Sequence, residues 1–224
     1  MFLDPIYFII VGPFMLLGLW ASWRVKSTFS AMSQEPAKMT GAQAARLMLD
    51  SAGLQSVAIE QIGGTLSDHY DPRSKVIRLS PEVYSARSMA AVGVACHEAG
   101  HALQDAHGYA PLVIRNMAVP AANIGSNLGM WMFIGGMLFQ IPGLVWIGIA
   151  AFSCVVIFQV INLPVEFNAS TRAKQQLVAH GIISDYETLY VSKVLNAAAL
   201  TYVAATLQAV ATLVYLLFRA SDRR

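Results

Sequence analysis

Apolar residues are gathered into four long runs along this chain of 224 residues. The runs cover residues 5–23, 116–139, 144–163 and 200–218, and none of them contains a charged side chain. An α-helix rises about 1.5 Å per residue and the hydrocarbon core of a bilayer is about 30 Å thick, so about 20 residues cross it. The pattern therefore predicts a mainly α integral membrane protein with four transmembrane helices.

The second and third runs are joined by residues 140–143, where a Pro-Gly pair favours a tight turn. We therefore expect these two runs to form a helical hairpin that returns the chain to the membrane face it left. Gly125 and Gly129 lie four residues apart in the second run. This spacing allows two helices to approach each other closely in lipid.

The polar segments carry weaker signals of helix and strand. In residues 24–116 the first predicted elements are a helix capped by Thr40 that ends near Gly53 and a strand at 56–62. A turn at 68–73 and a returning strand at 75–80 follow. The segment then continues with a short helix capped by Ser80 and a longer helix from 88 to about 105. The two strands predict a small β-hairpin at the membrane surface. In a zinc protease the strand just before the H-E-x-x-H helix, here 75–80, would hold an extended peptide by strand addition, although an ordinary hairpin fits the pattern equally well.

This alternation of apolar and polar segments divides the chain into five parts. They are an N-terminal transmembrane anchor (1–23), a zincin-like catalytic part (24–116), a transmembrane hairpin (117–163), a helical segment with a break at His180-Gly181 (164–199), and a last transmembrane helix with a short tail (200–224).

The composition agrees with a membrane protein, because 56% of the residues are hydrophobic and only 12% are charged. Soluble domains have about 25% charged residues. The net charge of +2 is too small to favour a nucleic-acid partner. Cys96 and Cys154 both lie in apolar stretches, which favours buried free thiols over a disulfide. Cys96 is also rotated by about 100° from the face of the helix that carries the adjacent histidine, so we expect it to pack in the core.

The long helix carries the sequence His97-Glu98-Ala-Gly-His101, which has the pattern H-E-x-x-H. Residues four apart lie on one face of a helix, so two imidazoles can bind one Zn²⁺ ion at about 2.0–2.1 Å each. Glu98 would lie beside the metal, where its carboxylate can take a proton from water. The alternative is a small-residue helix with two partly buried histidines, and the membrane context favours the metal site.

Most catalytic zinc ions have three protein ligands and one open position, and His107 is one candidate for the third place. His107 completes the spacing of the metzincin signature. That signature needs glycine where this chain has Gln104, so that the chain can turn sharply. On a straight helix His107 would lie about 9 Å beyond His101, which is out of reach of the metal.

Glu166 is the second candidate for the third ligand. It lies where the third run ends, on the membrane face to which the hairpin returns. A charged residue at a membrane boundary is a functional candidate by default. We therefore favour Glu166 as a metal ligand, and an ion pair with Arg172 or Lys174 is the alternative.

These motifs resemble those of gluzincin membrane proteases of the HtpX and CAAX prenyl protease type, in which H-E-x-x-H is followed by E-x-x-x-D. The likeness to the YugP-like family of bacterial membrane zinc metallopeptidases is closer and covers nearly the whole chain. It rests on Asp68-His-Tyr-Asp-Pro, Leu79-Ser80, His97-Glu-Ala-Gly-His-Ala-Leu-Gln104, Tyr109-Ala-Pro-Leu, Leu163-Pro-Val-Glu-Phe-Asn-Ala-Ser170 and Asn196-Ala-Ala-Ala-Leu-Thr-Tyr202. The resemblance implies one zinc ion on His97, His101 and Glu166, with Glu98 as the base.

The chain departs from these family patterns at two positions. Ser170 stands where the HtpX-type pattern has Asp, and Asn168 stands where a YugP-like chain is expected to have Asp. A carboxylate in this region would orient His97 by a hydrogen bond to its second ring nitrogen. The sequence leaves the orienting residue open, and Asp105, one turn beyond the motif, is a substitute.

The expected activity is that of a zinc-dependent endopeptidase, which also needs a group that stabilises the tetrahedral oxyanion. Tyr202, at the start of the last run, is our candidate. A tyrosine at that place is at least as well explained as part of the aromatic belt at a membrane interface. His180, Tyr186 and Arg172 are further candidates.

Two other classes of function compete with the protease. A non-catalytic membrane scaffold or chaperone could keep the fold and bind peptides, but the presence of Glu98 argues against it. A transporter is a third reading, and the lack of charged residues within the runs argues against that one. The partners expected of the protease are a peptide or membrane-protein substrate, the lipid bilayer and a regulatory membrane protein of unknown identity.

The distribution of basic residues bears on the orientation in the membrane. Twelve of the fifteen Lys and Arg residues lie in the segments 24–116 and 164–199, whereas Arg219, Arg223 and Arg224 follow the last run. Cytoplasmic loops carry an excess of basic residues. We therefore predict a multi-pass protein of the bacterial inner membrane with its site on the cytoplasmic side, although Arg24 and Lys26 favour this orientation and the C-terminal arginines oppose it.

Overall fold

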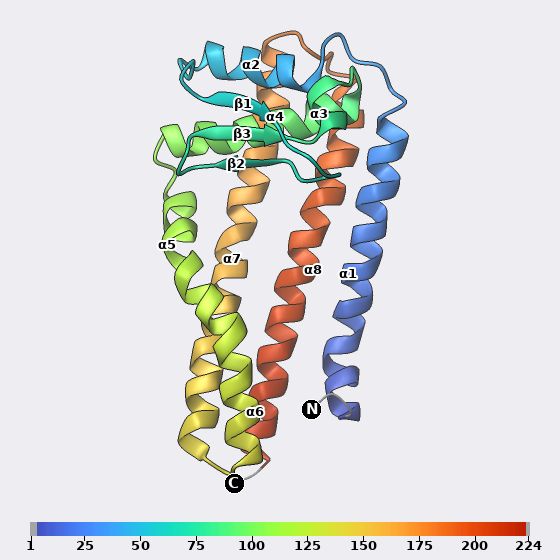
Figure 1. The fold of residues 1–224 in the computed structure, drawn as a ribbon. Helices are drawn as coiled ribbons and strands as arrows, with labels where there is room; N and C mark the ends of the chain where they lie inside the picture. The colour runs from blue at the N-terminus through green and yellow to red at the C-terminus, as the bar shows by residue number, and fades with distance from the viewer. Residues whose placement is uncertain (1–3, 223–224) are drawn as a thin grey trace. The chain divides into compact units, whose positions relative to one another are not determined.

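The computed structural model describes residues 4–222, which are mainly helical (Figure 1). The elements follow one another as α1 (Pro5–Met32), α2 (Gly41–Ser51), β1 (Ala58–Gln61), β2 (His69–Asp71), β3 (Val76–Leu79), α3 (Pro81–Ser85), α4 (Met89–Ala106), α5 (Ala110–Ile124), the π-helical segment η1 (Gly125–Gly129), α6 (Met130–Leu138), α7 (Pro142–Ala179) and α8 (Thr188–Ser221). The prediction of a mainly α protein with a small β part is therefore confirmed.

The described residues form two compact units. We call one the span unit, whose described residues are 4–21, 113–164 and 200–222. The other, which we call the site unit, consists of Ser22–Leu112 and Val165–Ala199. Helices α1, α7 and α8 each contribute residues to both units.

Three helices, α1, α7 and α8, are long and apolar enough to cross a membrane. They contain the first, third and fourth of the apolar runs. The second run is helical as well, but η1 divides it, so that neither α5 nor α6 alone has the length of a membrane span. Many large apolar side chains of this run are exposed, among them Met117, Leu128 and Trp131. The fourth transmembrane helix remains a prediction.

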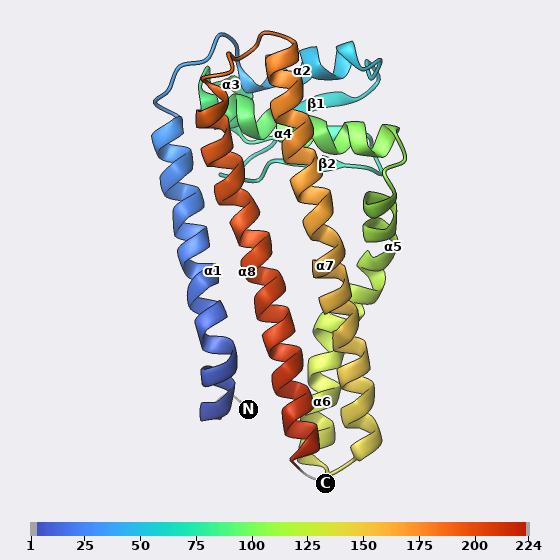
Figure 2. The same cartoon turned by 180° about the vertical axis from the view of Figure 1, so that it is seen from behind.

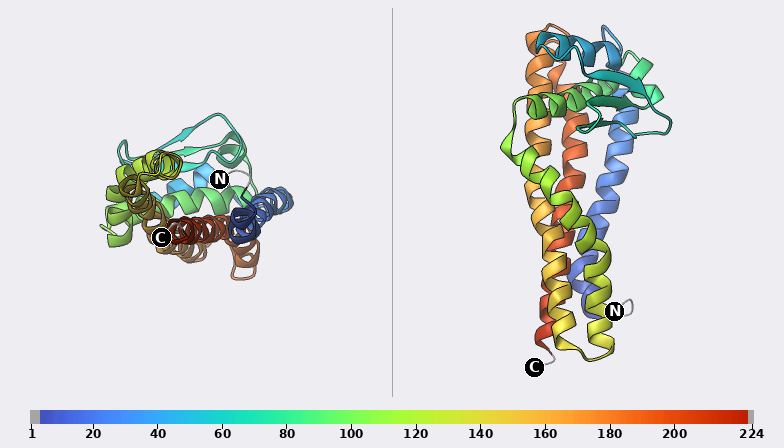
Figure 3. Two further views of the ribbon diagram at one scale, coloured as in Figure 1. Left: turned by 90° about the horizontal axis from the view of Figure 1, so that it is seen from below. Right: turned by 60° about the vertical axis from the view of Figure 1, so that its left-hand side comes forward.

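In the span unit, α5, η1 and α6 pack closely along α7, and glycines make this packing possible (Figure 3). A methyl group on Gly125 would lie 2.2 Å from the carbonyl oxygen of Ala151, and one on Gly129 would lie 3.0 Å from the amide nitrogen of Phe152. The close approach that the spacing of these two glycines predicted is therefore confirmed.

Helix α8 lies between α1 and the hairpin of α6 and α7 within the span unit (Figure 3). The ring of Tyr215 packs edge-on against that of Tyr7 at 5.1 Å. Its hydroxyl donates a hydrogen bond of 2.9 Å to Asp4, and Arg219 forms an ion pair of 3.2 Å with the same carboxylate. These contacts fix the start of α1 beside the end of α8.

The sheet of the site unit differs from the hairpin expected at 56–62 and 75–80. Strands β1 and β3 are parallel neighbours, and β2 pairs antiparallel with the other edge of β3, which gives the order β1-β3-β2. The segment expected as a turn contains β2, and the chain reverses between β2 and β3, where Lys75 has a φ of 56°. The physical reason is that β3 is the most apolar strand, so it is buried in the centre while the exposed β1 lies at an edge.

Helix α4 occupies the middle of the site unit (Figures 1 and 2). The sheet lies on one of its sides, and residues 165–179 of α7 and 188–199 of α8 lie on the other. Small residues make this position possible: a methyl group on Gly93 would lie 3.2 Å from Val191, and Gly100 faces the backbone of α7. Most side chains of α4 are therefore buried.

Candidate metal centre

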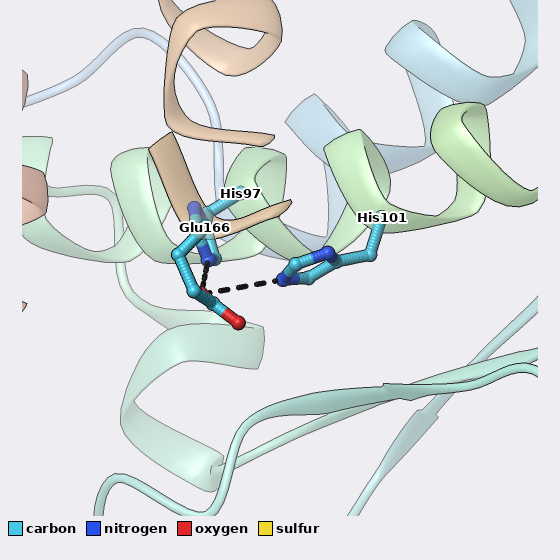
Figure 4. A group of neighbouring side chains, drawn as sticks. All are labelled: His97, His101 and Glu166. Carbon is cyan, nitrogen blue, oxygen red and sulfur yellow. Dashed lines mark hydrogen bonds and ion pairs between the residues drawn. The ribbon is translucent and has the colours of Figure 1, made fainter. Parts of the chain in front are cut away.

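Helix α4 forms where the sequence predicts it, because its N-terminus is capped. Ser88 precedes the helix, and its hydroxyl accepts a hydrogen bond of 3.2 Å from the backbone N–H of Ala91. One helical turn separates His97 from His101, and their rings lie edge to face with centroids 4.8 Å apart. The two imidazoles therefore project from the same face of α4 (Figure 4).

Glu166 reaches these imidazoles from α7, 65 residues after His101 in the chain. Its Oε2 atom lies 3.2 Å from Nε2 of His97 and 3.6 Å from Nε2 of His101 (Figure 4). One ligand atom from each of the three residues lies within 4.8 Å of the others, so the group could hold a metal ion. His101 is 8% exposed and Glu166 only 5% exposed, which leaves the polar atoms of the site little contact with solvent.

The approach of α7 depends on Gly100, inside the H-E-x-x-H motif. A methyl group at this position would lie 2.7 Å from the carbonyl oxygen of Ala169. Real Cβ atoms are essentially never that close to a backbone oxygen. Because Glu166 lies three residues before Ala169 on the same helix, this contact determines how near the carboxylate comes to the imidazoles.

The chemistry of the donor set fits zinc. Two imidazole nitrogens and one carboxylate oxygen form one of the ligand sets that catalytic zinc uses, with a fourth position left for water or substrate. Burial lowers the pKa of His101, but its hydrogen bond to Glu166 and the charges of Glu98 and Glu166 outweigh burial, so that the pKa lies above its usual value. The site therefore has a surplus of negative charge that favours a cation.

Each imidazole has a partner at its second ring nitrogen. Ser170 lies 3.1 Å from Nδ1 of His97, and the side-chain oxygen of Gln104 lies 3.0 Å from Nδ1 of His101. The substitute considered for orienting His97, Asp105, instead accepts hydrogen bonds from Tyr70 and Lys75 and connects α4 to the sheet.

Gln104 and Gly100 are the two residues of this site that sequence reasoning missed. In the sequence, Gln104 is notable only because it stands where the metzincin signature has glycine. A glutamine three residues after a ligand, on the helix that carries the motif, is the signal that the sequence offers for its role. No local signal marks the contact of Gly100, because its partner Ala169 is 69 residues away.

Three other candidate residues do not belong to the group of three ligands. Nδ1 of His107 lies 2.6 Å from the carbonyl oxygen of Leu103, at the end of α4. Cys96 is fully buried in the core, and burial raises the pKa of its thiol. Tyr202 belongs to the span unit, on α8.

The three further candidates for stabilising the oxyanion, His180, Arg172 and Tyr186, lie in the site unit. His180 contacts Ser51 and Gln176 through its Nε2 atom, at 2.9 Å in each case. Arg172 donates a hydrogen bond of 2.7 Å to Asn168, and the side chain of Tyr186 is 71% exposed. None of these contacts tests a role in catalysis.

Known proteins resemble this chain over most of its length. A family model described as "Putative neutral zinc metallopeptidase" matches residues 7–221. The chain is also 50% identical over 193 residues to a protein of Bacillus subtilis (strain 168) named "Putative membrane protease YugP". That alignment covers 85% of this chain and 86% of the other protein. No solved structure matches the chain.

Proposed function

Since the chain belongs to this zinc metallopeptidase family, we propose that it is a membrane-embedded zinc-dependent endopeptidase of the gluzincin type. One observation carries the proposal: His97, His101 and Glu166 come together in space from two helices. Glu98, whose side chain is buried, directly follows His97 in the sequence. A chain of this family that kept only the fold would have no need of all four residues.

The residues of this chain divide the work of peptide hydrolysis among them. His97, His101 and Glu166 would hold one zinc ion, which supplies a Lewis acid that polarises the scissile carbonyl and acidifies water. Glu98 takes the proton of the attacking water and delivers it to the leaving amine. Tyr202 remains our candidate for the group that stabilises the oxyanion.

The substrates we propose are membrane proteins or segments that emerge from the membrane. The three long apolar helices and the name of the Bacillus subtilis relative support this choice. Strand β3, in the segment 75–80 where the sequence predicted that a peptide would bind, is paired along both edges, so it cannot take up a further strand. We propose instead that β2, the edge strand beside β3 in the described part of the chain, holds an extended peptide by strand addition. We propose a multi-pass protein of the bacterial inner membrane, with the site on the cytoplasmic side.

The test compares the purified wild-type protein with Glu98→Gln. We expect about one zinc ion per chain in both proteins, because Glu98 is not a ligand, and cleavage of casein by the wild type alone. Loss of the base should lower the rate by about 10²–10⁴-fold. Glu82→Gln, which changes an exposed carboxylate on α3, is the matched control and should cleave at the wild-type rate. Equal cleavage by wild type and Glu98→Gln would contradict the proposed mechanism.

A further inference from the structure

The side chain of Gln104 is fully buried beside the metal centre and forms hydrogen bonds at both ends of its amide. Its Oε1 atom lies 3.0 Å from Nδ1 of His101. Its Nε2 atom lies 2.8 Å from the carbonyl oxygen of Val165 and 3.0 Å from Oδ1 of Asn168. One side chain of α4 therefore connects a candidate metal ligand to the helix that carries another.

The partners of Gln104 determine which way round its amide lies. A backbone carbonyl can only accept a hydrogen bond, so the NH₂ group must face Val165. Asn168 gives the same answer independently, because its Oδ1 atom also receives a hydrogen bond of 2.7 Å from Arg172, and a guanidinium can only donate. The oxygen of Gln104 is consequently the atom that faces His101.

An oxygen that can only accept requires a donor at Nδ1 of His101. The imidazole must carry a proton on Nδ1, and a neutral ring then has its lone pair on Nε2, the atom that faces Glu166. His97 is different, because its Nδ1 atom faces the hydroxyl of Ser170, which can donate or accept. Ser170 therefore does not dictate the tautomer of its imidazole.

We propose that Gln104 is a positioning residue that sets His101 in the tautomer and orientation needed to bind metal through Nε2, and that Asn168 and Arg172 hold the amide of Gln104 in place. The proposal rests on the proposed role of His101 as a zinc ligand. It explains how a chain with asparagine at position 168 orients the site without a further carboxylate: an oriented neutral amide takes the place of the charged partner on His101.

The first measurement concerns the wild-type protein without metal. With ¹⁵N-labelled histidine, NMR distinguishes protonated from unprotonated ring nitrogens, and His101→Gln identifies the signals of His101. We expect the proton of the neutral His101 ring on Nδ1. A proton on Nε2 would overturn the proposal, whether or not the protein binds zinc or cleaves peptides.

The second measurement compares zinc affinities, obtained by competition with a chelator. Gln104→Met keeps the length of the side chain but removes its hydrogen bonds, and should weaken zinc binding about 10–100-fold. Gln104→Glu keeps an acceptor toward His101, and its other oxygen can donate to Val165 when the carboxyl is protonated, so this variant should bind at least several-fold more tightly than Gln104→Met. Ser170→Ala should have a smaller effect than Gln104→Met. Wild-type affinity in Gln104→Met, or equal losses in both Gln104 variants, would overturn the proposal.

Failure of this inference can be told apart from failure of the proposed function. If the wild type binds no zinc, or if Glu98→Gln cleaves as well as the wild type, the proposed function fails while the tautomer measurement still decides the role of Gln104. Thermal unfolding of Gln104→Met in detergent shows whether a loss of affinity reflects a damaged fold. If Gln104→Met does not fold, the tautomer of the wild type gives the decision.

Discussion

His107 and Glu166 are the two candidates for the third ligand of the metal centre. The absence of glycine at position 104 argues against His107 on helical geometry, and the structure places the Nδ1 atom of His107 against its own helix. Glu166 was reached by an argument about the course of the chain, since a membrane hairpin must return to the face it left. Gln104 lies three residues after His101, but its role also depends on partners more than 60 residues away, which this local spacing does not identify.

Substitution of the two competing residues tests the third ligand directly. We expect Glu166→Ala to lose zinc during dialysis against a weak chelator, because two imidazoles alone bind zinc poorly and the buried cation would lose its only anionic ligand. His107→Ala should retain about one zinc ion per chain. Metal analysis of the dialysed proteins gives the answer, and retained zinc in Glu166→Ala together with loss in His107→Ala would reverse the assignment.

Helix α4 was predictable as an element, whereas its surroundings were not. The cap at Ser88 and the four-residue spacing of the motif are local features, and they identified the helix to within a residue at each end. The order of the sheet depends on which strand is buried most deeply, a property of the whole site unit. The pairing of β1 with β3 as parallel neighbours therefore could not be obtained from the turn residues between them.

The contact between α4 and α7 leads to a prediction for Gly100. In Gly100→Ala the new methyl group meets the carbonyl oxygen of Ala169, so the two helices must separate. Overpacking of this kind costs about 1–3 kcal/mol of unfolding free energy. We also expect weaker zinc binding, because Glu166 moves away from the imidazoles with its helix. Thermal unfolding in detergent and chelator competition measure the two effects.

The matched control for Gly100→Ala is Gly143→Ala, which lies in the first turn of α7. A methyl group there meets nothing within 4 Å, so this variant should be as stable as the wild type or slightly more stable, with unchanged zinc affinity. If Gly100→Ala matched this control in both measurements, the close contact between α4 and α7 would not control the position of Glu166.

At the scale of the whole molecule, the number of membrane crossings decides on which sides the termini lie. Three long apolar helices alone would place the two ends of the chain on opposite sides. The span unit argues otherwise, because Asp4 at the start of α1 contacts both Tyr215 and Arg219 near the end of α8. Two ends in contact must be on the same side, which requires an even number of crossings. We therefore expect the continuous stretch of α5, η1 and α6 to supply a fourth crossing.

Reporter fusions test both the number of crossings and the orientation in a bacterial host. Alkaline phosphatase is active only outside the cytoplasm, and green fluorescent protein fused to a Sec-exported chain fluoresces only inside it. We expect phosphatase activity from fusions at either terminus and fluorescence from an insertion after Asp185, in the exposed loop between α7 and α8. Termini on opposite sides would contradict the fourth crossing. If both termini lay in the cytoplasm, the four crossings would stand, but the metal centre would lie outside the cytoplasm. In that case the basic residues of 24–116 and 164–199 would not determine the orientation of the protein in the membrane.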